Sequence, residues 1–200
     1  QKIQNQLNNH NKIDNLAQRD EEESFIKSLN LIASKPMLYI CNVDEKSAVK
    51  GNVFSTFVKE KVNKESNEIL LVSSVMESQL AELNDETDKL EMLNELELKE
   101  SALKKVIHAG YNLLNLITFF TCDPKETRAW TITKNAKALQ AARKIHTDFE
   151  KGFIRAETIS YKDFVNYKGE AACREAGKLR QEGKDYIVRD GDVFRFLFNL

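Results

Sequence analysis

Residues 35–45 have the sequence KPMLYICNVDE, and this stretch decides how the first half of the chain folds. Five apolar residues run from Met37 to Cys41, after a proline and before Asn42. An apolar run this short is typical of a strand buried in a parallel sheet. Because open α/β sheets bind ligands beyond the carboxyl ends of their strands, residues 42–45 are a candidate ligand-binding turn. A plain turn after a strand explains the same four residues.

A second strand with a polar end follows a short way along the chain. Residues 53–62 carry apolar side chains at helical spacing, and residues 69–72 form another short apolar run. The order strand, helix, strand predicts a βαβ unit with a right-handed crossover. Parallel strands end at the same edge of a sheet, so residues 73–75 are expected beside residues 42–45.

The pattern changes near residue 115. Residues 76–116 predict further helices, whose many acidic side chains are expected on solvated faces. Residues 116–121 and 128–133 are rich in β-forming residues and flank a turn signal at 123–126, which predicts a hairpin. The other predicted elements are a helix over 137–149, a strand over 153–159, a short helix or turn over 161–167 and a strand over 193–198.

The charge of the chain is nearly balanced, with 30 Lys and Arg against 31 Asp and Glu. A chain with so little net charge is not expected to bind a polyelectrolyte, such as a nucleic acid, over its whole surface. Residues 134–200, however, hold 14 basic and 10 acidic side chains, which indicates an acidic partner such as RNA. We expect no membrane span, because no apolar run reaches the roughly 18 residues that a span needs. We also expect no signal peptide.

The Cys and His residues form no recognisable metal or catalytic site. Cys41, Cys122 and Cys173 lie far apart, which predicts free thiols in a reducing, cytoplasmic compartment. His146 and Asp148 are two positions apart on a predicted helix, so a polar cluster at the helix end is the simpler interpretation. Trp130, Phe119 and Phe120 could stack on RNA bases, but core packing of a small module explains them equally well.

The turn at residues 42–45 resembles the base-binding N-K-x-D element of P-loop GTPases. It differs from that element by Val43 in place of Lys and Glu45 in place of Asp. A carboxylate one methylene longer cannot keep the same two contacts to guanine without moving the base. Guanine preference should therefore weaken, and adenine becomes acceptable if Asn42 or a backbone carbonyl takes its exocyclic amine. The phosphate-binding pattern G-x-x-x-x-G-K-[ST] does not occur in the chain, so we expect no nucleotide hydrolysis by this chain alone.

Over about residues 20–200 the chain resembles the YchF/Obg-like ATPases, a family of the P-loop GTPase superfamily. The similarity is carried by residues 35–45 and, more specifically, by the runs 116–121, 128–131, 145–157, 175–178 and 183–193. The resemblance implies an α/β part followed by an α+β part. Residues 1–30 would be the end of a helical coiled-coil arm, residues 31–114 the C-terminal βαβ part of a P-loop G domain, and residues 115–200 a ubiquitin-like β-grasp domain of the TGS type.

The resemblance also implies which residues bind the nucleotide. The base-specificity motif would be Asn42, Val43 and Glu45, with Val43 contacting adenine through its backbone. A second base loop would consist of Ser73, Ser74 and Val75. The P-loop and the Mg²⁺ ligands are expected before Gln1, so neither a catalytic residue nor a metal ligand is expected within this chain.

The function implied by the resemblance is that of a ribosome-associated, ATP-preferring P-loop NTPase. The full-length protein would bind and hydrolyse ATP with Mg²⁺, and would also bind GTP. Its partners would be the ribosome, through either subunit, and RNA through the TGS domain, with no DNA or membrane partner. The alternative is a nucleotide-independent module that binds RNA or the ribosome.

Overall fold

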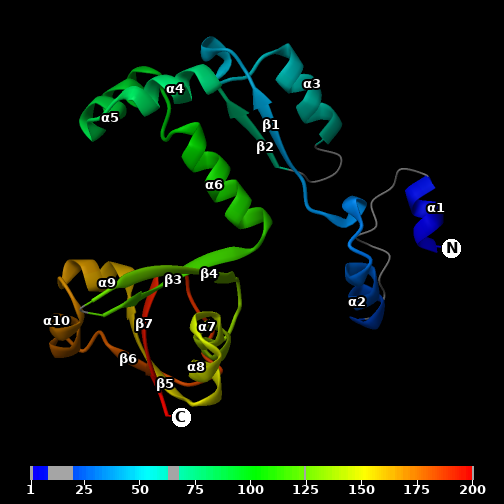
Figure 1. Ribbon diagram of the computed structural model, residues 1–200. Helices are drawn as coiled ribbons and strands as arrows, with labels where there is room; N and C mark the ends of the chain where they lie inside the picture. Colours follow the sequence, from blue (N-terminus) through cyan, green and yellow to red (C-terminus); the bar gives the residue numbers. More distant parts are fainter. Residues whose placement is uncertain (1, 9–19, 63–67, 124, 200) are drawn as a thin grey trace. The chain divides into compact units, whose positions relative to one another are not determined.

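The computed structural model describes residues 2–8, 20–62, 68–123 and 125–199 (Figure 1). The chain divides into two compact units, Gln1–Ala109 and Gly110–Leu200. The predicted arm over residues 1–30 falls partly outside the described residues. Its described parts are two helices, α1 (Lys2–Asn8) and α2 (Asp20–Ser28).

The first unit contains the predicted βαβ element. Strand β1 (Leu38–Asn42) pairs in parallel with β2 (Glu68–Val72), and helix α3 (Val53–Val62) lies between them in sequence. Two single 3₁₀ turns flank β1, η1 (Ile32–Ser34) before it and η2 (Glu45–Ser47) after it. Figure 1 shows β1 and β2 side by side. The short apolar runs and the helical spacing therefore predicted these elements correctly.

Burial of β1 is less than predicted. Ile40, in the middle of the strand, is 50% exposed, and none of the other β1 residues is fully buried. Parallel strands are normally covered on both faces by helices. Within the described residues the sheet has only two strands, which give little surface for such cover. The prediction of a fully buried strand is therefore wrong for β1.

Three helices follow β2, as predicted for residues 76–116. They are α4 (Ser74–Glu82), α5 (Glu86–Glu95) and α6 (Ala102–Leu113). The Glu77 carboxylate in α4 accepts hydrogen bonds from the N–H groups of Ala102 and Leu103, at 2.5 and 3.1 Å. Ser101 Oγ accepts from Lys104 N at 3.3 Å, as expected of a capping serine. Glu77 therefore satisfies the first orphan donors of α6 and ties α6 to α4.

The second unit is built on a five-stranded sheet in the order β4-β3-β7-β5-β6. Strand β3 pairs in parallel with β7, and the other neighbours are antiparallel. The strands are β3 (Leu116–Cys122), β4 (Thr127–Thr133), β5 (Phe153–Ser160), β6 (Arg180–Glu182) and β7 (Asp192–Phe198). The hairpin and both later strands match the prediction. The sequence analysis missed β6, because three residues without an apolar pattern give no strand signal.

The helix predicted over residues 137–149 is two helices. Helix α7 ends at Ile145, and His146 has an extended backbone with φ −159° and ψ 146°. The Nδ1 atom of His146 accepts a hydrogen bond from Asp148 N at 3.2 Å and so begins a new short helix. This local bond, which favours the start of a helix, overrides the continuous helical pattern. The helices of this unit are α7 (Ala138–Ile145), α8 (Thr147–Lys151), α9 (Tyr161–Asn166) and α10 (Glu170–Glu175).

Aromatic side chains form the core of the second unit. Phe119 is fully buried, and its ring lies 6.5 Å from that of Trp130 and 5.6 Å from that of Phe194, between centroids. Buried alanines of α7 pack on this face of the sheet. Aromatic pairs at these separations add to the stability gained from area burial alone. Phe119 is therefore a core residue, and the stacking of Phe119 on RNA bases is excluded.

A buried carboxylate joins β7 to the segment before it. Asp192 is 2% exposed, and its oxygens accept hydrogen bonds from the Tyr186 hydroxyl at 2.9 Å, the Arg180 guanidinium at 3.3 Å and Arg189 N at 2.9 Å. Burial, and then the bond to Asp192, raise the pKa of Tyr186. A buried charge is tolerated only when it is satisfied in this way. Asp192 therefore holds the loop before β7 in one conformation.

The cysteines are free thiols, as predicted. Cys173 is buried, which raises the pKa of its thiol, while Cys41 and Cys122 are half-buried. Among the described residues, no helix has both the length and the apolar character that crossing a membrane requires.

The Asp192 network gives a test of the fold. Asp192→Ala removes the shared acceptor and leaves Arg180 and Tyr186 without their buried partner. We expect the free energy of unfolding to fall by about 3 kcal/mol in urea denaturation. Asp185→Ala, which removes an exposed partner of Lys137, is the matched control and should cost much less. Equal losses in the two variants would show that the buried network does not stabilise this unit.

Candidate functional site

The carboxyl ends of β1 and β2 bring the six predicted site residues together. Asn42 is the register partner of Val72, so residues 42–45 and 73–75 leave the sheet at the same edge. The N–H group of Val43 donates to Val72 O at 2.8 Å, which extends the pairing one residue beyond β1. The two turns are therefore held beside each other by the ladder itself.

Asn42 joins the two turns directly. Its side chain is exposed, and its Oδ1 atom accepts a hydrogen bond from Ser74 N at 3.2 Å. An amide oxygen that accepts from a backbone N–H fixes the orientation of the amide, so the amino group is the side that faces outward. Asn42 thus offers a donor. The expectation that Asn42 takes an exocyclic amine stays a prediction, because the bond from Ser74 leaves the Asn42 oxygen a second lone pair.

Val43 can contribute to a site only through its backbone. Its side chain is 9% exposed, and its N–H group is used in the bond to Val72. The carbonyl oxygen is thus the main-chain atom of Val43 left for a ligand. An oxygen acceptor at this position suits a ligand N–H group, such as an exocyclic amine.

Asp44 has a structural role that the sequence analysis did not assign. Its carboxylate accepts hydrogen bonds from Ser47 N at 3.1 Å and from the Ser47 hydroxyl at 2.9 Å, and so caps η2. The hydroxyl bond holds the pKa of Asp44 below its usual value. The spacing D-x-x-S is a common capping signal and could have predicted this role. Because Asp44 is occupied, the exposed carboxylate of Glu45 is the acceptor that the turn presents to a ligand.

The predicted loop at residues 73–75 is mostly the first turn of a helix. Ser73 precedes α4, while Ser74 and Val75 are its first residues and are exposed. The first N–H groups of a helix have no intrahelical partners. Here Ser74 N is bonded to Asn42 Oδ1, Met76 is buried, and Val75 is exposed. Ser73 is 3% exposed, and its hydroxyl oxygen has no hydrogen-bond partner within the described residues.

Gly51 and the start of α3 fix the loop after Glu45. Gly51 has φ +78°, and a Cβ atom there would lie 2.5 Å from Ser55 Oγ. Asn52 and Ser55 form reciprocal bonds: Asn52 N donates to Ser55 Oγ at 2.8 Å, and Ser55 N donates to Asn52 Oδ1 at 3.0 Å. This pair caps α3. The loop after the candidate site is therefore built to hold one conformation.

The assembled groups can recognise a flat, polar ring. The site offers donors from the Asn42 amino group and the start of α4, and acceptors from Val43 and Glu45. No cluster of three or more metal-ligating side chains occurs in the part of the chain that the structure describes. The arrangement thus supports binding and orientation of a ligand.

The second unit matches a known protein family. Residues 116–199 match the family YchF-GTPase_C, described as a protein of unknown function (DUF933). The ribosome-binding ATPase YchF of Escherichia coli O157:H7 is 53% identical over 180 residues, which are 90% of this chain and 49% of that protein. The protein of the same name from Haemophilus influenzae is 48% identical over 200 residues, which are 100% of this chain and 54% of that protein.

A solved structure agrees with these sequence relatives. The YchF GTPase of Schizosaccharomyces pombe superimposes on 98% of this chain with a TM-score of 0.83 and 36% sequence identity, and the match covers 52% of that protein. The chain thus spans about half the length of the curated relatives that it matches. The names of these relatives differ on the nucleotide, since the bacterial proteins are called ATPases and the yeast protein a GTPase.

Proposed function

The chain belongs to the YchF family of Obg-like proteins and matches their C-terminal portion. We propose that it is part of a ribosome-associated P-loop NTPase. The full-length protein would bind and hydrolyse ATP with Mg²⁺ in the cytoplasm and would also accept GTP. The relatives named as ribosome-binding ATPases, which are up to 53% identical, support this proposal. The role of the first unit would be to bind the nucleotide base.

The bond between Asn42 and Ser74 carries the proposal for the base. With its oxygen held by Ser74, the Asn42 amino group would donate to N7, a ring acceptor that adenine and guanine share. The exocyclic amine of adenine is a donor, and it would bond to the Glu45 carboxylate or to the Val43 carbonyl. Asn42 would then select a purine, and residues 43–45 would distinguish adenine from guanine.

The chemistry at the phosphates would come from outside this chain. The sequence contains no P-loop motif, and the described residues hold no cluster suited to Mg²⁺. When bound, Mg²⁺ would neutralise charge on the phosphates during transfer. The chain's own contribution would be to fix the base and so to orient the nucleotide. We therefore propose that the chain alone does not hydrolyse ATP.

The domain assignment follows the same proposal. Residues 31–114 would be the C-terminal part of a P-loop G domain, and residues 1–30 the end of its helical arm. Residues 115–200 would be a ubiquitin-like β-grasp domain of the TGS type. The mixed five-stranded sheet with α7 packed on one face supports this last assignment. This domain would contact RNA on either ribosomal subunit.

The alternative function is a nucleotide-independent module that binds RNA or the ribosome. The excess of basic side chains in residues 134–200 favours it. A titration of labelled ATP against the chain tests whether the first unit binds a nucleotide without the phosphate contacts. No binding at micromolar concentration supports the view that the phosphate contacts are essential, whereas tight ATP binding by the chain alone would contradict it.

The role of Glu45 can be tested in a full-length protein that contains this sequence. Glu45→Asp shortens the acceptor to the length that suits guanine. We expect the ratio of ATP to GTP affinity to move about tenfold toward GTP, which corresponds to roughly 1.4 kcal/mol. Equilibrium dialysis with labelled ATP and GTP measures this ratio.

Glu82→Asp is the matched control, because this exposed glutamate lies at the far end of α4. Val43→Lys is not a useful companion, because Val43 is buried and a lysine there would bring a charge against apolar groups. An unchanged ratio in Glu45→Asp would show that the backbone, and not this side chain, distinguishes the bases.

Ribosome binding is testable with the chain itself. We expect the chain to pellet with 70S ribosomes at 50 mM salt, and the pelleted fraction to fall several-fold at 200 mM salt, because phosphate contacts release counterions. Centrifugation through a sucrose cushion measures this fraction. Absence from the pellet at low salt would contradict ribosome association through this chain, and a salt-independent signal would contradict phosphate contacts.

A further inference from the structure

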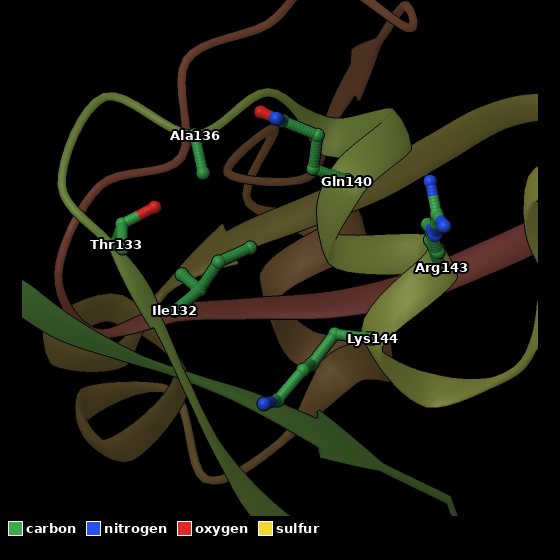
Figure 2. A pocket seen from close by; sticks show the side chains of 6 residues that line it. All are labelled: Ile132, Thr133, Ala136, Gln140, Arg143 and Lys144. Carbon is green, nitrogen blue, oxygen red and sulfur yellow. The ribbon is translucent and has the colours of Figure 1, made fainter. Parts of the chain in front are cut away.

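An open groove of about 320 Å³ lies between β4 and α7 in the second unit (Figure 2). Its volume is within the range of sites that hold small ligands. Figure 2 shows side chains of the strand end and the following turn on one side, with those of α7 on the other. The groove is lined by Ile132, Thr133, Ala136, Gln140, Arg143 and Lys144, and is called the α7 groove below.

The polar groups of the α7 groove are matched to an anion. Arg143 and Lys144 are exposed cations, and none of the described residues that line the groove is acidic. Gln140 Oε1 accepts from Lys137 N at 2.8 Å, so the amino group of Gln140 is left to donate. The hydroxyl of Thr133 can donate as well. The groove therefore presents cations and hydrogen-bond donors without the acidic side chains that usually accompany them on a protein surface.

The two cations are available for a ligand to different degrees. The Lys144 side chain makes no hydrogen bond or ion pair within the described part of the chain, and Figure 2 shows its amine extended from α7. Arg143 Nε lies 3.5 Å from a Glu150 oxygen, which occupies one edge of the guanidinium. Its remaining N–H groups can still bond to a phosphate. An exposed pair at 3.5 Å is weak, so it does not compete strongly with a ligand.

The floor of the α7 groove is apolar. Ile132 is half-buried and Ala136 is 4% exposed, and both line the groove together with the polar side chains. An apolar surface of this kind suits the flat face of a base or the carbon side of a ribose. A rim of cations around an apolar floor is the combination that single-stranded nucleic acids need, because they pair backbone charges with apolar base contacts.

We propose that the α7 groove binds a nucleotide of single-stranded RNA, with Arg143 and Lys144 on its phosphates and Ile132 and Ala136 against its base or ribose. Gln140 and Thr133 would bond to the polar edge of the base or to the ribose hydroxyls. This inference rests on the proposed function, since it locates the RNA contact of the second unit. It differs from stacking on Phe119, which is buried in the core, and on Trp130, which packs against that core.

The test uses the whole chain and a fluorescein-labelled 12-nucleotide oligouridylate. Anisotropy titrations at 50, 100 and 200 mM KCl give the dissociation constant and its salt dependence. On a single strand, each lost phosphate contact lowers the salt slope by about 0.7. For the double variant Arg143→Gln/Lys144→Gln we expect a slope about 1.4 smaller and a dissociation constant about 25-fold higher at 100 mM KCl.

The matched control is Arg155→Gln/Lys162→Gln. It removes the same two kinds of cation from exposed positions of the same unit that do not line the groove. All four positions are exposed, so thermal unfolding should be unchanged in both double variants. We expect the control to bind oligouridylate within about threefold of the wild type. Equal weakening in the two variants would overturn the proposal. It would show that the positive charge of the whole unit attracts the RNA, and that the groove is not a specific site.

Two further outcomes are decisive. No binding of oligouridylate by the wild type at 50 mM KCl overturns the α7 groove as an RNA site, even if the chain pellets with ribosomes. Displacement of the RNA by poly-glutamate at equal charge concentration would also overturn it, since an acidic peptide would then be the better ligand. If the wild type binds the RNA but does not pellet with ribosomes, the α7 groove is supported as an RNA site and the proposed ribosome association is contradicted.

Discussion

The hydrogen bond from the Ser74 N–H group to Asn42 Oδ1 is the contact on which the candidate site depends. It joins the ends of two parallel strands that lie 32 residues apart in the sequence. It also orients the amide, because the oxygen faces the Ser74 N–H group and the amino group is left as the donor that Asn42 can offer. The surrounding bonds of Asp44 and of Asn52 with Ser55 then hold the adjoining loop in place.

The two units are stabilised in different ways. The second unit has an aromatic core around Phe119 and a buried carboxylate, Asp192, that is fully hydrogen-bonded. The first unit leaves Ile40 half-exposed on a two-stranded sheet and relies more on local caps, such as Glu77 at the start of α6. A well-packed unit suits a surface that docks on a large partner. A site made from strand ends suits a ligand whose other contacts come from further parts of a protein.

Much of the fold could be predicted from the sequence, because its elements have strong local signals. The apolar runs at β1 and β2 and the helical spacing of α3 are of this kind. Strand β6 could not be predicted, because three residues carry no periodicity. The break at His146 depends on a side-chain bond that a helical pattern does not reveal. Of the candidate site, the sequence predicted that the two turns lie at one edge of the sheet but not the orientation of Asn42, which a contact distant in sequence determines.

The central claim is that the Asn42 amino group binds N7 of a purine. The most direct test compares ATP with 7-deaza-ATP, which lacks only this acceptor, in a full-length protein that contains the chain. The account predicts that 7-deaza-ATP binds roughly fivefold to tenfold more weakly, as for the loss of a hydrogen bond worth about 1 kcal/mol, and that Asn42→Ala abolishes the difference. Equal affinities for the two nucleotides in the wild type would contradict it.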